Sequence, residues 1–588
     1  MKYIKTNHWT NASEQEGLLF FAQILNEALF DYTLDTYKPP ALNLRLLCIE
    51  ALETIDNIKI GLIKKPNLES VIDELLWCLE GDITAKDFLG SKLQGLRERI
   101  NSRKNELPKL KEAILLLYHY LDDKKYLNKV KELLLDLVPA NKEKKKIYSL
   151  TRVFITELIN YGYNASYIYF KTNKFFFDYK KRFKETSPMT FFEIFDFKEK
   201  EFDVVYRVSK LFEEFRNVAE NMGFNIVDSY PSTGLFKEAK TFIEGKVENE
   251  LFVVFKKINA LDETTARIKT ENTLFKIGNL FSFYHHKETP TISEQALVKS
   301  KTDNIVRLLA EPIKSIIKKA DVKPTTAAIK VKSLFTTLSL PPNTIYRIGR
   351  AIDLHSISLT SEQVENKLLN LWTAIETLIP KDIECGDDRI VQIVKSLTPF
   401  QELKYVNKLI EQAGSDFLFF DGTKSKELIN SVILKQKENS FFSLAALIMT
   451  KENEDNRKKV YEALKTYPLL RFRLFTINQN LSTGIRIKKL LDNHRKKVEW
   501  QIRRIYRVRN LIVHSGKVPS YTNILVENLH NYFDDFLNYI IDNAIKDKRI
   551  KTISDAILTA EIDCECLRKN INTIHEAETE LDNYATVL

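Results

Sequence analysis

The sequence predicts a mainly helical protein with several domains. Of its 588 residues, 44% are hydrophobic and 29% are charged, while glycine and proline number only 16 each. Apolar residues often recur at three- and four-residue steps, the spacing that places them on one face of an α-helix. The length exceeds what one hydrophobic core usually serves, so two to four domains are expected.

Residues 1–140 are predicted to form a helical N-terminal domain. Apolar residues with helical spacing occupy 42–60, 68–78, 110–121 and 127–137. Pro139 and the charged run NKEKKK at 141–146 mark a boundary, because a proline followed by such a run interrupts regular structure.

Residues 147–335 are predicted to form a small α+β domain with a regulatory role. In the stretch EFDVVYRVS, positions 202, 204, 206 and 208 are apolar and share one face, which is typical of a strand. Further strands are expected at 224–227 and 251–258, with helices at 210–221 and after Asp262. The order strand, helix, strand, strand, helix favours a ferredoxin-like arrangement.

Residues 343–545 are predicted to contain four principal helices with an insertion at 381–460. The first covers 343–359, and the second follows a capping-box sequence, TSEQ, at 360–363. The third covers 485–514, with one break allowed, and the fourth is centred on 525–536. Residues 549–588 are expected to form a helical tail.

The positive charge of the chain is concentrated beside the third helix. The formal net charge is +10, yet residues 471–517 contain thirteen Lys or Arg and only two acidic residues. The rest of the chain is therefore close to neutral. A basic field of this kind suits a polyanion such as nucleic acid, although basic helix faces are also common as plain solvated surface.

One segment of the third helix, VEWQIRRIYRVRNLIVHSGK at 498–517, carries the candidate chemistry. Arg509 falls on the apolar row of this helix, a position that a surface cation does not need. His514 follows five residues later, near an end that Ser515 and Gly516 predict. An arginine donates paired hydrogen bonds to a phosphate, and a histidine exchanges protons near neutral pH.

The same residues also allow a purely structural interpretation. Arg509 would then pair with a buried acid such as Glu376, and His514 would only cap the helix. The spacing Arg-x4-His recurs at Arg350 and His355, which are interpreted as packing and capping residues or, alternatively, as part of a cleft. Two other histidines are predicted to face RNA or solvent: His494 and His530.

The sequence RNLIVH at 509–514 matches the Arg-polar-x3-His signature of HEPN domains, whose ribonucleases cut RNA without a metal. The segments 351–378 and 467–516 resemble the ApeA-like branch of this family, found in bacterial anti-phage systems. The resemblance covers 343–545 and implies a four-helix bundle that dimerises, so that two motifs line one cleft. By motif position it implies Arg509, Asn510 and His514 as catalytic residues and Glu376 as a supporting residue.

The expected activity is metal-independent endoribonuclease cleavage, with tRNA as a candidate substrate and 2′,3′-cyclic phosphate and 5′-OH ends as products. The resemblance implies an abortive-infection effector that forms a homodimer and responds to a phage-derived trigger or regulatory partner. The alternatives are a non-catalytic RNA-binding scaffold and a toxin neutralised by a partner antitoxin. The predicted RNA-binding residues are Arg503, Arg504, Arg507 and Lys517.

No cofactor or metal is predicted. The five cysteines are scattered and odd in number, which suits reduced thiols in a cytoplasmic protein. Cys564 and Cys566 lack the second pair that a zinc site would need. No uncharged apolar run approaches the roughly 18 residues of a membrane span, so no membrane segment is expected.

Overall fold

The computed structural model describes residues 6–10, 14–31, 33–302, 304–311, 316, 322–337, 340–381, 388–434, 440–546 and 550–588. Cys385 lies outside them. The chain divides into a larger unit (Met1–Thr156, Tyr179–Pro188 and Lys314–Leu588) and a smaller unit (Glu157–Asp178 and Met189–Ile313). This grouping differs from the four predicted segments, because the N-terminal and C-terminal helices belong to one unit.

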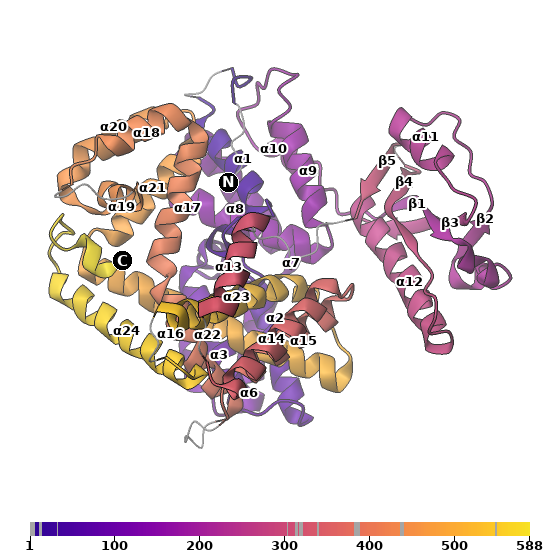
Figure 1. Cartoon of the computed structure of the whole chain (residues 1–588). Coiled ribbons are helices and arrows are strands. Elements are labelled where there is room, and N and C mark those ends of the chain that lie inside the picture. The colour runs from indigo at the N-terminus through magenta and orange to yellow at the C-terminus, as the bar shows by residue number, and fades with distance from the viewer. Residues whose placement is uncertain are drawn as a thin grey trace. The chain divides into compact units, whose positions relative to one another are not determined.

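The N-terminal part is helical, as predicted. Four of its helices coincide with the predicted apolar segments, and Asn43 begins one of them by accepting a hydrogen bond from the Leu46 amide at 3.1 Å. The helices are α1 (Glu16–Ala28), α2 (Leu44–Lys59), α3 (Asn67–Gly81), α4 (Ile83–Leu89), α5 (Lys92–Ser102), α6 (Leu107–Tyr120), α7 (Asp123–Ala140) and α8 (Lys144–Tyr161) (Figure 1).

All four predicted principal helices are present and share one apolar core, in which Trp372 is fully buried. They are α14 (Pro342–Thr360), α15 (Val364–Leu378), α22 (Gly484–Ser515) and α23 (Thr522–Lys546). The helix α22 is unbroken over 32 residues, so the allowed break does not occur. Two further helices join this core: α16 (Arg389–Leu403) and α24 (Ile553–Ile574).

The inserted region and the C-terminal end form a second apolar core. The N-terminal part of α22 enters it through Ile487 and Leu491, so one helix belongs to both cores. The helices of this region are α17 (Tyr405–Phe420), α18 (Gly422–Asn430), α19 (Ser440–Met449), α20 (Glu454–Ala463) and α21 (Pro468–Leu481), while α13 (Pro324–Thr337) precedes α14.

The smaller unit contains one five-stranded sheet in the order β2-β3-β1-β4-β5. Every described strand pair is antiparallel, and β3 lies between β1 and β2, as the inserted strand of a split β-α-β unit does. The order β2-β3-β1-β4 is that of the predicted ferredoxin-like sheet, and β5 extends it beyond β4. The strands are β1 (Lys200–Ser209), β2 (Phe224–Val227), β3 (Glu250–Ala260), β4 (Ile292–Ser300) and β5 (Val306–Ala310).

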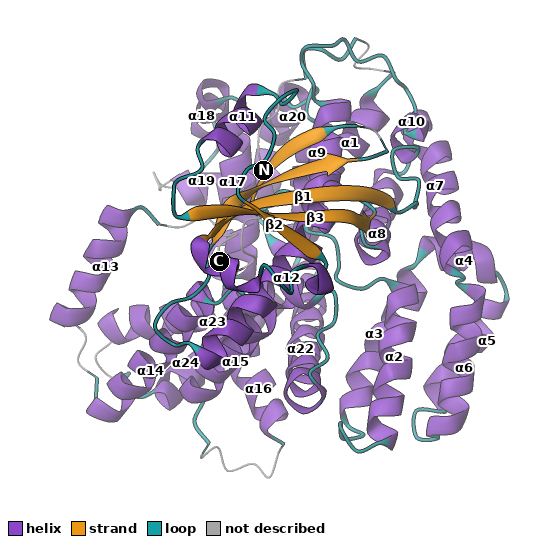
Figure 2. Ribbon diagram, turned by 90° about the vertical axis from the view of Figure 1, so that its right-hand side faces the viewer, coloured by secondary structure: helices purple, strands orange, loops and turns teal. Residues whose placement is uncertain are grey.

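Helices cover both faces of this sheet (Figure 2). The helix α12 (Glu263–Tyr284), which Asp262 caps as predicted, packs on one face, and α11 (Lys237–Glu244) packs on the other. The region predicted as a helix at 210–221 instead forms two short 3-10 turns, η2 (Lys210–Phe215) and η3 (Glu220–Met222). The unit also contains α9 (Ala165–Phe176) and α10 (Met189–Phe192).

Among the described residues, no helix combines the length and the apolar character needed to cross a bilayer. The described cysteines are all free thiols.

Gly484, the first residue of α22, lies against the end of α24, and we expect Gly484→Ala to destabilise the larger unit. A Cβ there would lie 2.4 Å from the Ile571 carbonyl oxygen and 2.7 Å from the His575 amide nitrogen. Both are backbone atoms, which cannot shift out of the way as easily as a flexible side chain. The expected loss is about 1–3 kcal/mol in the free energy of unfolding, measured by chemical denaturation. Gly422→Ala is the control, because Gly422 also begins a helix and its Cβ would meet nothing within 4 Å. Equal effects of the two substitutions would contradict the predicted contact.

Candidate nucleic-acid site

The candidate site lies at the C-terminal end of α22. The helix begins after Thr483, whose hydroxyl accepts a hydrogen bond from the Arg486 amide at 3.4 Å. It ends at Gly516, which adopts a left-handed conformation (φ 64°) and donates its amide to the Ile512 carbonyl at 3.0 Å. This ending leaves His514 in the last turn and exposed to solvent.

Arg509 is half-buried, and its Nη1 donates a hydrogen bond to the Asn510 side-chain oxygen at 3.0 Å. Asn510 and His514 are four residues apart and therefore lie on nearly the same side of the helix. Arg509 and His514 are separated by about 7.5 Å of helical rise and by about 140° around the axis. The three predicted catalytic residues thus belong to one helix end but do not converge on one point.

Glu376 does not neutralise Arg509 in the described part of the chain. Glu376 is half-buried in α15, and its backbone carbonyl accepts a hydrogen bond from Arg389 Nη2 at 2.9 Å. No ion pair joins Arg509 to Glu376 or to any other described acid. The described residues therefore do not form the buried ion pair that the structural interpretation of Arg509 requires.

Arg504 and Arg507, two of the four predicted RNA-binding residues, are instead buried between α22 and the N-terminal helices. They are only 2% and 3% exposed, and both donate to Glu50 of α2 at 2.9 Å. Arg504 also reaches Glu74 of α3 at 2.5 Å. Burial alone would raise the pKa of Glu50, but the two guanidinium groups outweigh it and lower that pKa to about 2. Arg504 and Arg507 are therefore the counter-ions of the buried Glu50 carboxylate. The prediction that these two arginines bind RNA is wrong.

Much of the remaining basic excess is also neutralised internally. Arg473 is buried between Glu27 and Asp416, Arg471 pairs with Glu16, and the exposed Lys517 contacts Glu53 at 2.8 Å. The apparent basic field is therefore smaller than the charge count suggests. Seven Lys or Arg residues along α22 form no ion pair with another described residue: Arg486, Lys488, Lys489, Lys496, Lys497, Arg503 and Arg509.

The second Arg-x4-His spacing does not form a similar site. Arg350 is exposed on α14, whereas the His355 ring stacks on Phe533 and donates to or accepts from His530. Burial lowers the pKa of His355, although the Asp534 carboxylate acts in the opposite direction. His530 is only 9% exposed, so its prediction as an RNA-facing or surface group is wrong.

His494 is half-buried on α22 and stacks on Tyr405 with 3.6 Å between the ring centroids. Burial, together with the positive charges of Lys408 and Lys497, lowers its pKa to about 3. The unfolded chain, with a histidine pKa of about 6.5, therefore binds this proton more readily than the folded protein.

We expect this histidine to make the protein less stable as the pH falls from about 6.5 towards 3, by about 1.4 kcal/mol per pH unit. His494→Gln removes the titrating group, so its stability should decline less over that range and should parallel the wild type above about pH 7.5. Chemical denaturation at several pH values measures the difference. Identical pH profiles of the two proteins would contradict the lowered pKa.

Comparisons with protein-family models, with curated proteins and with solved structures find no match to this chain.

Proposed function

We propose that this chain is a metal-independent endoribonuclease of HEPN type, acting as an anti-phage effector. The proposal rests on the resemblance of 343–545 and on one structural observation: Arg509 and His514 are the unpaired cation and the solvent-exposed imidazole at the end of one helix. Neither of these two predicted catalytic residues forms an ion pair with an acid in the described part of the chain. They are therefore available to a phosphate and to a proton transfer.

The chemistry follows from what RNA itself provides. The 2′-OH beside each phosphate attacks the phosphorus, and the 5′-oxygen leaves, which gives a 2′,3′-cyclic phosphate and a 5′-OH. His514 exchanges the proton of the attacking or leaving oxygen, because a histidine side chain can act as a general acid or a general base. Arg509 stabilises the negative charge that develops on the phosphoryl oxygens. Asn510 orients the Arg509 guanidinium through their hydrogen bond.

The angular separation of Arg509 and His514 favours a site built from two copies of the chain. A phosphate held by Arg509 of one chain would lie to one side of its own His514, since the two residues project about 140° apart. A second α22 placed against the first would supply an imidazole from the facing side. A homodimer is therefore part of the proposal.

The test is the incubation of purified protein with total RNA and with tRNA in the presence of EDTA. We expect cleavage that persists in chelator and leaves 2′,3′-cyclic phosphate and 5′-OH ends. Arg509→Ala should lower the cleavage rate by about 10²–10³-fold, the typical cost of losing one transition-state donor. Arg350→Ala is the matched control, because Arg350 has the same Arg-x4-His spacing but is exposed on another helix.

Other outcomes separate the alternatives. RNA binding without cleavage, unchanged in Arg509→Ala, would identify a scaffold and overturn the nuclease proposal. Cellular toxicity that only a co-expressed neighbouring gene relieves would identify a toxin with an antitoxin partner.

A further inference from the structure

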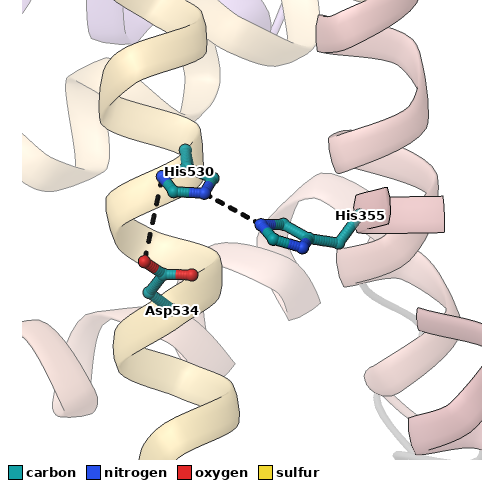
Figure 3. A group of neighbouring side chains, drawn as sticks. All are labelled: His355, His530 and Asp534. Carbon is teal, nitrogen blue, oxygen red and sulfur yellow. Dashed lines mark hydrogen bonds and ion pairs between the residues drawn. The ribbon is translucent and has the colours of Figure 1, made fainter. Parts of the chain in front are cut away.

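Two histidines and a carboxylate from distant parts of the sequence meet between α14 and α23 (Figure 3). His355 lies on α14, while His530 and Asp534 are one turn apart on α23. The two imidazole Nε2 atoms lie 2.8 Å apart, and His530 Nδ1 lies 3.8 Å from an Asp534 carboxylate oxygen. One potential ligand atom from each residue lies within 4.8 Å of the other two.

The surroundings fix both rings. The His355 ring is nearly parallel to the Phe533 ring, at a centroid distance of 5.1 Å, and nearly parallel to the His530 ring, at 5.0 Å. His530 is only 9% exposed, so its ring has little freedom to turn towards solvent. The two Nε2 atoms consequently point at one shared position.

That position suits a cation. When both rings are neutral, the Nε2 atoms share a single proton, since one ring donates and the other accepts. A metal ion at the same place would use both lone pairs at once. Neutral imidazole is the form that binds metals, and imidazole nitrogens favour Zn²⁺, Ni²⁺ or Co²⁺ over the hard ions Mg²⁺ and Ca²⁺.

We propose that His355, His530 and Asp534 form a binding site for a divalent first-row transition metal, with Zn²⁺ as the reference ion. His355 and His530 bind it through Nε2, Asp534 supplies a carboxylate oxygen, and water takes the fourth position. Zn–N bonds of about 2.0–2.1 Å in tetrahedral geometry place the two nitrogens about 3.3 Å apart. The rings therefore separate by about half an ångström, and the carboxylate turns from Nδ1 towards the ion.

The consequence of binding is a cross-link between α14 and α23. The metal joins a residue near the start of the bundle to its last principal helix, and binding to the folded state alone raises stability. The site is separate from Arg509, Asn510 and His514 on α22, and it does not depend on the proposed nuclease activity. The sequence predicted no metal because the histidines are 175 positions apart.

The experiment uses the full chain after removal of metals with a chelator. Isothermal titration with ZnCl₂ and the visible absorption of added Co²⁺ report binding, and thermal unfolding with and without Zn²⁺ reports the cross-link. We expect one equivalent bound per chain and a higher melting temperature with Zn²⁺. His355→Gln and Asp534→Asn should each weaken binding at least about 10-fold and abolish the melting shift.

His119→Gln is the control, because His119 is an exposed histidine in the last turn of α6. It should bind Zn²⁺ like the wild type. The proposal is overturned if the wild-type chain binds neither ion, a result that needs no folded variant. It is also overturned if a folded His355→Gln or Asp534→Asn protein binds Zn²⁺ as tightly as the wild type does.

Discussion

His514→Ala is expected to lower the rate of RNA cleavage by about 10²–10⁴-fold, the usual contribution of a positioned general acid or base. The imidazole is exposed in the last turn of α22, so its removal leaves no cavity in the bundle. The variant should keep the unfolding midpoint of the wild type and its affinity for RNA. A change in rate without a change in stability separates a chemical role from a structural one.

The matched control for this substitution is His119→Ala. His119 is also an exposed histidine in the last turn of a helix, α6, but it belongs to the N-terminal helices. Cleavage by this control should equal that of the wild type. Gel-resolved initial rates in EDTA measure both variants, and equal rates for His514→Ala and the wild type would remove His514 from the mechanism.

Glu50→Ala is expected to lower the free energy of unfolding by about 3–5 kcal/mol, because it leaves two buried guanidinium groups without their shared counter-ion. Arg504 and Arg507 both bind Glu50, and all three side chains are less than one tenth exposed. Glu74 remains within reach of Arg504 but does not pair with Arg507. Chemical denaturation, followed by circular dichroism, measures the loss.

Glu53→Ala provides the comparison. Glu53 lies three residues away on the same helix, and it pairs at 2.8 Å with Lys517, which is 55% exposed. Ion pairs of this exposed kind contribute about 0–1 kcal/mol. A Glu50→Ala protein no less stable than Glu53→Ala would show that the buried network does not join the N-terminal helices to α22.

The helical part of the fold was predictable from local pattern, whereas the sheet was predictable only in part. The helices α14, α15, α22 and α23 each carry a long apolar row of period 3.6, which tertiary contacts only reinforce. The strand β4 was missed because its burial changes along its length: Ser293 is half-buried, Glu294 and Gln295 are exposed, and Ala296 to Val298 are buried. That pattern has neither clean alternation nor a continuous apolar run.

The site was predictable to the extent that it is local. Arg509, Asn510 and His514 are contiguous on one helix, so their spacing already places them at its end. The burial of Arg504 and Arg507 was not predictable, because their partner Glu50 is more than 450 positions away. Charge counted along a sequence does not distinguish a cation that faces solvent from one that neutralises a distant acid.

The helix α22 is uninterrupted and connects the two apolar cores. Ile487 is held in the second core and Ile512 in the first, and about 40 Å of rigid rod separates Ile487 from His514. A tilt of about 3° at the Ile487 end would move the imidazole by about 2 Å, which exceeds the displacement of about 1 Å that typically costs an enzyme 10²-fold in rate. A displacement that begins at the inserted helices would therefore reach the far end of α22 together with a shift of the side chains that pack Val498 to Ile512 into the first core.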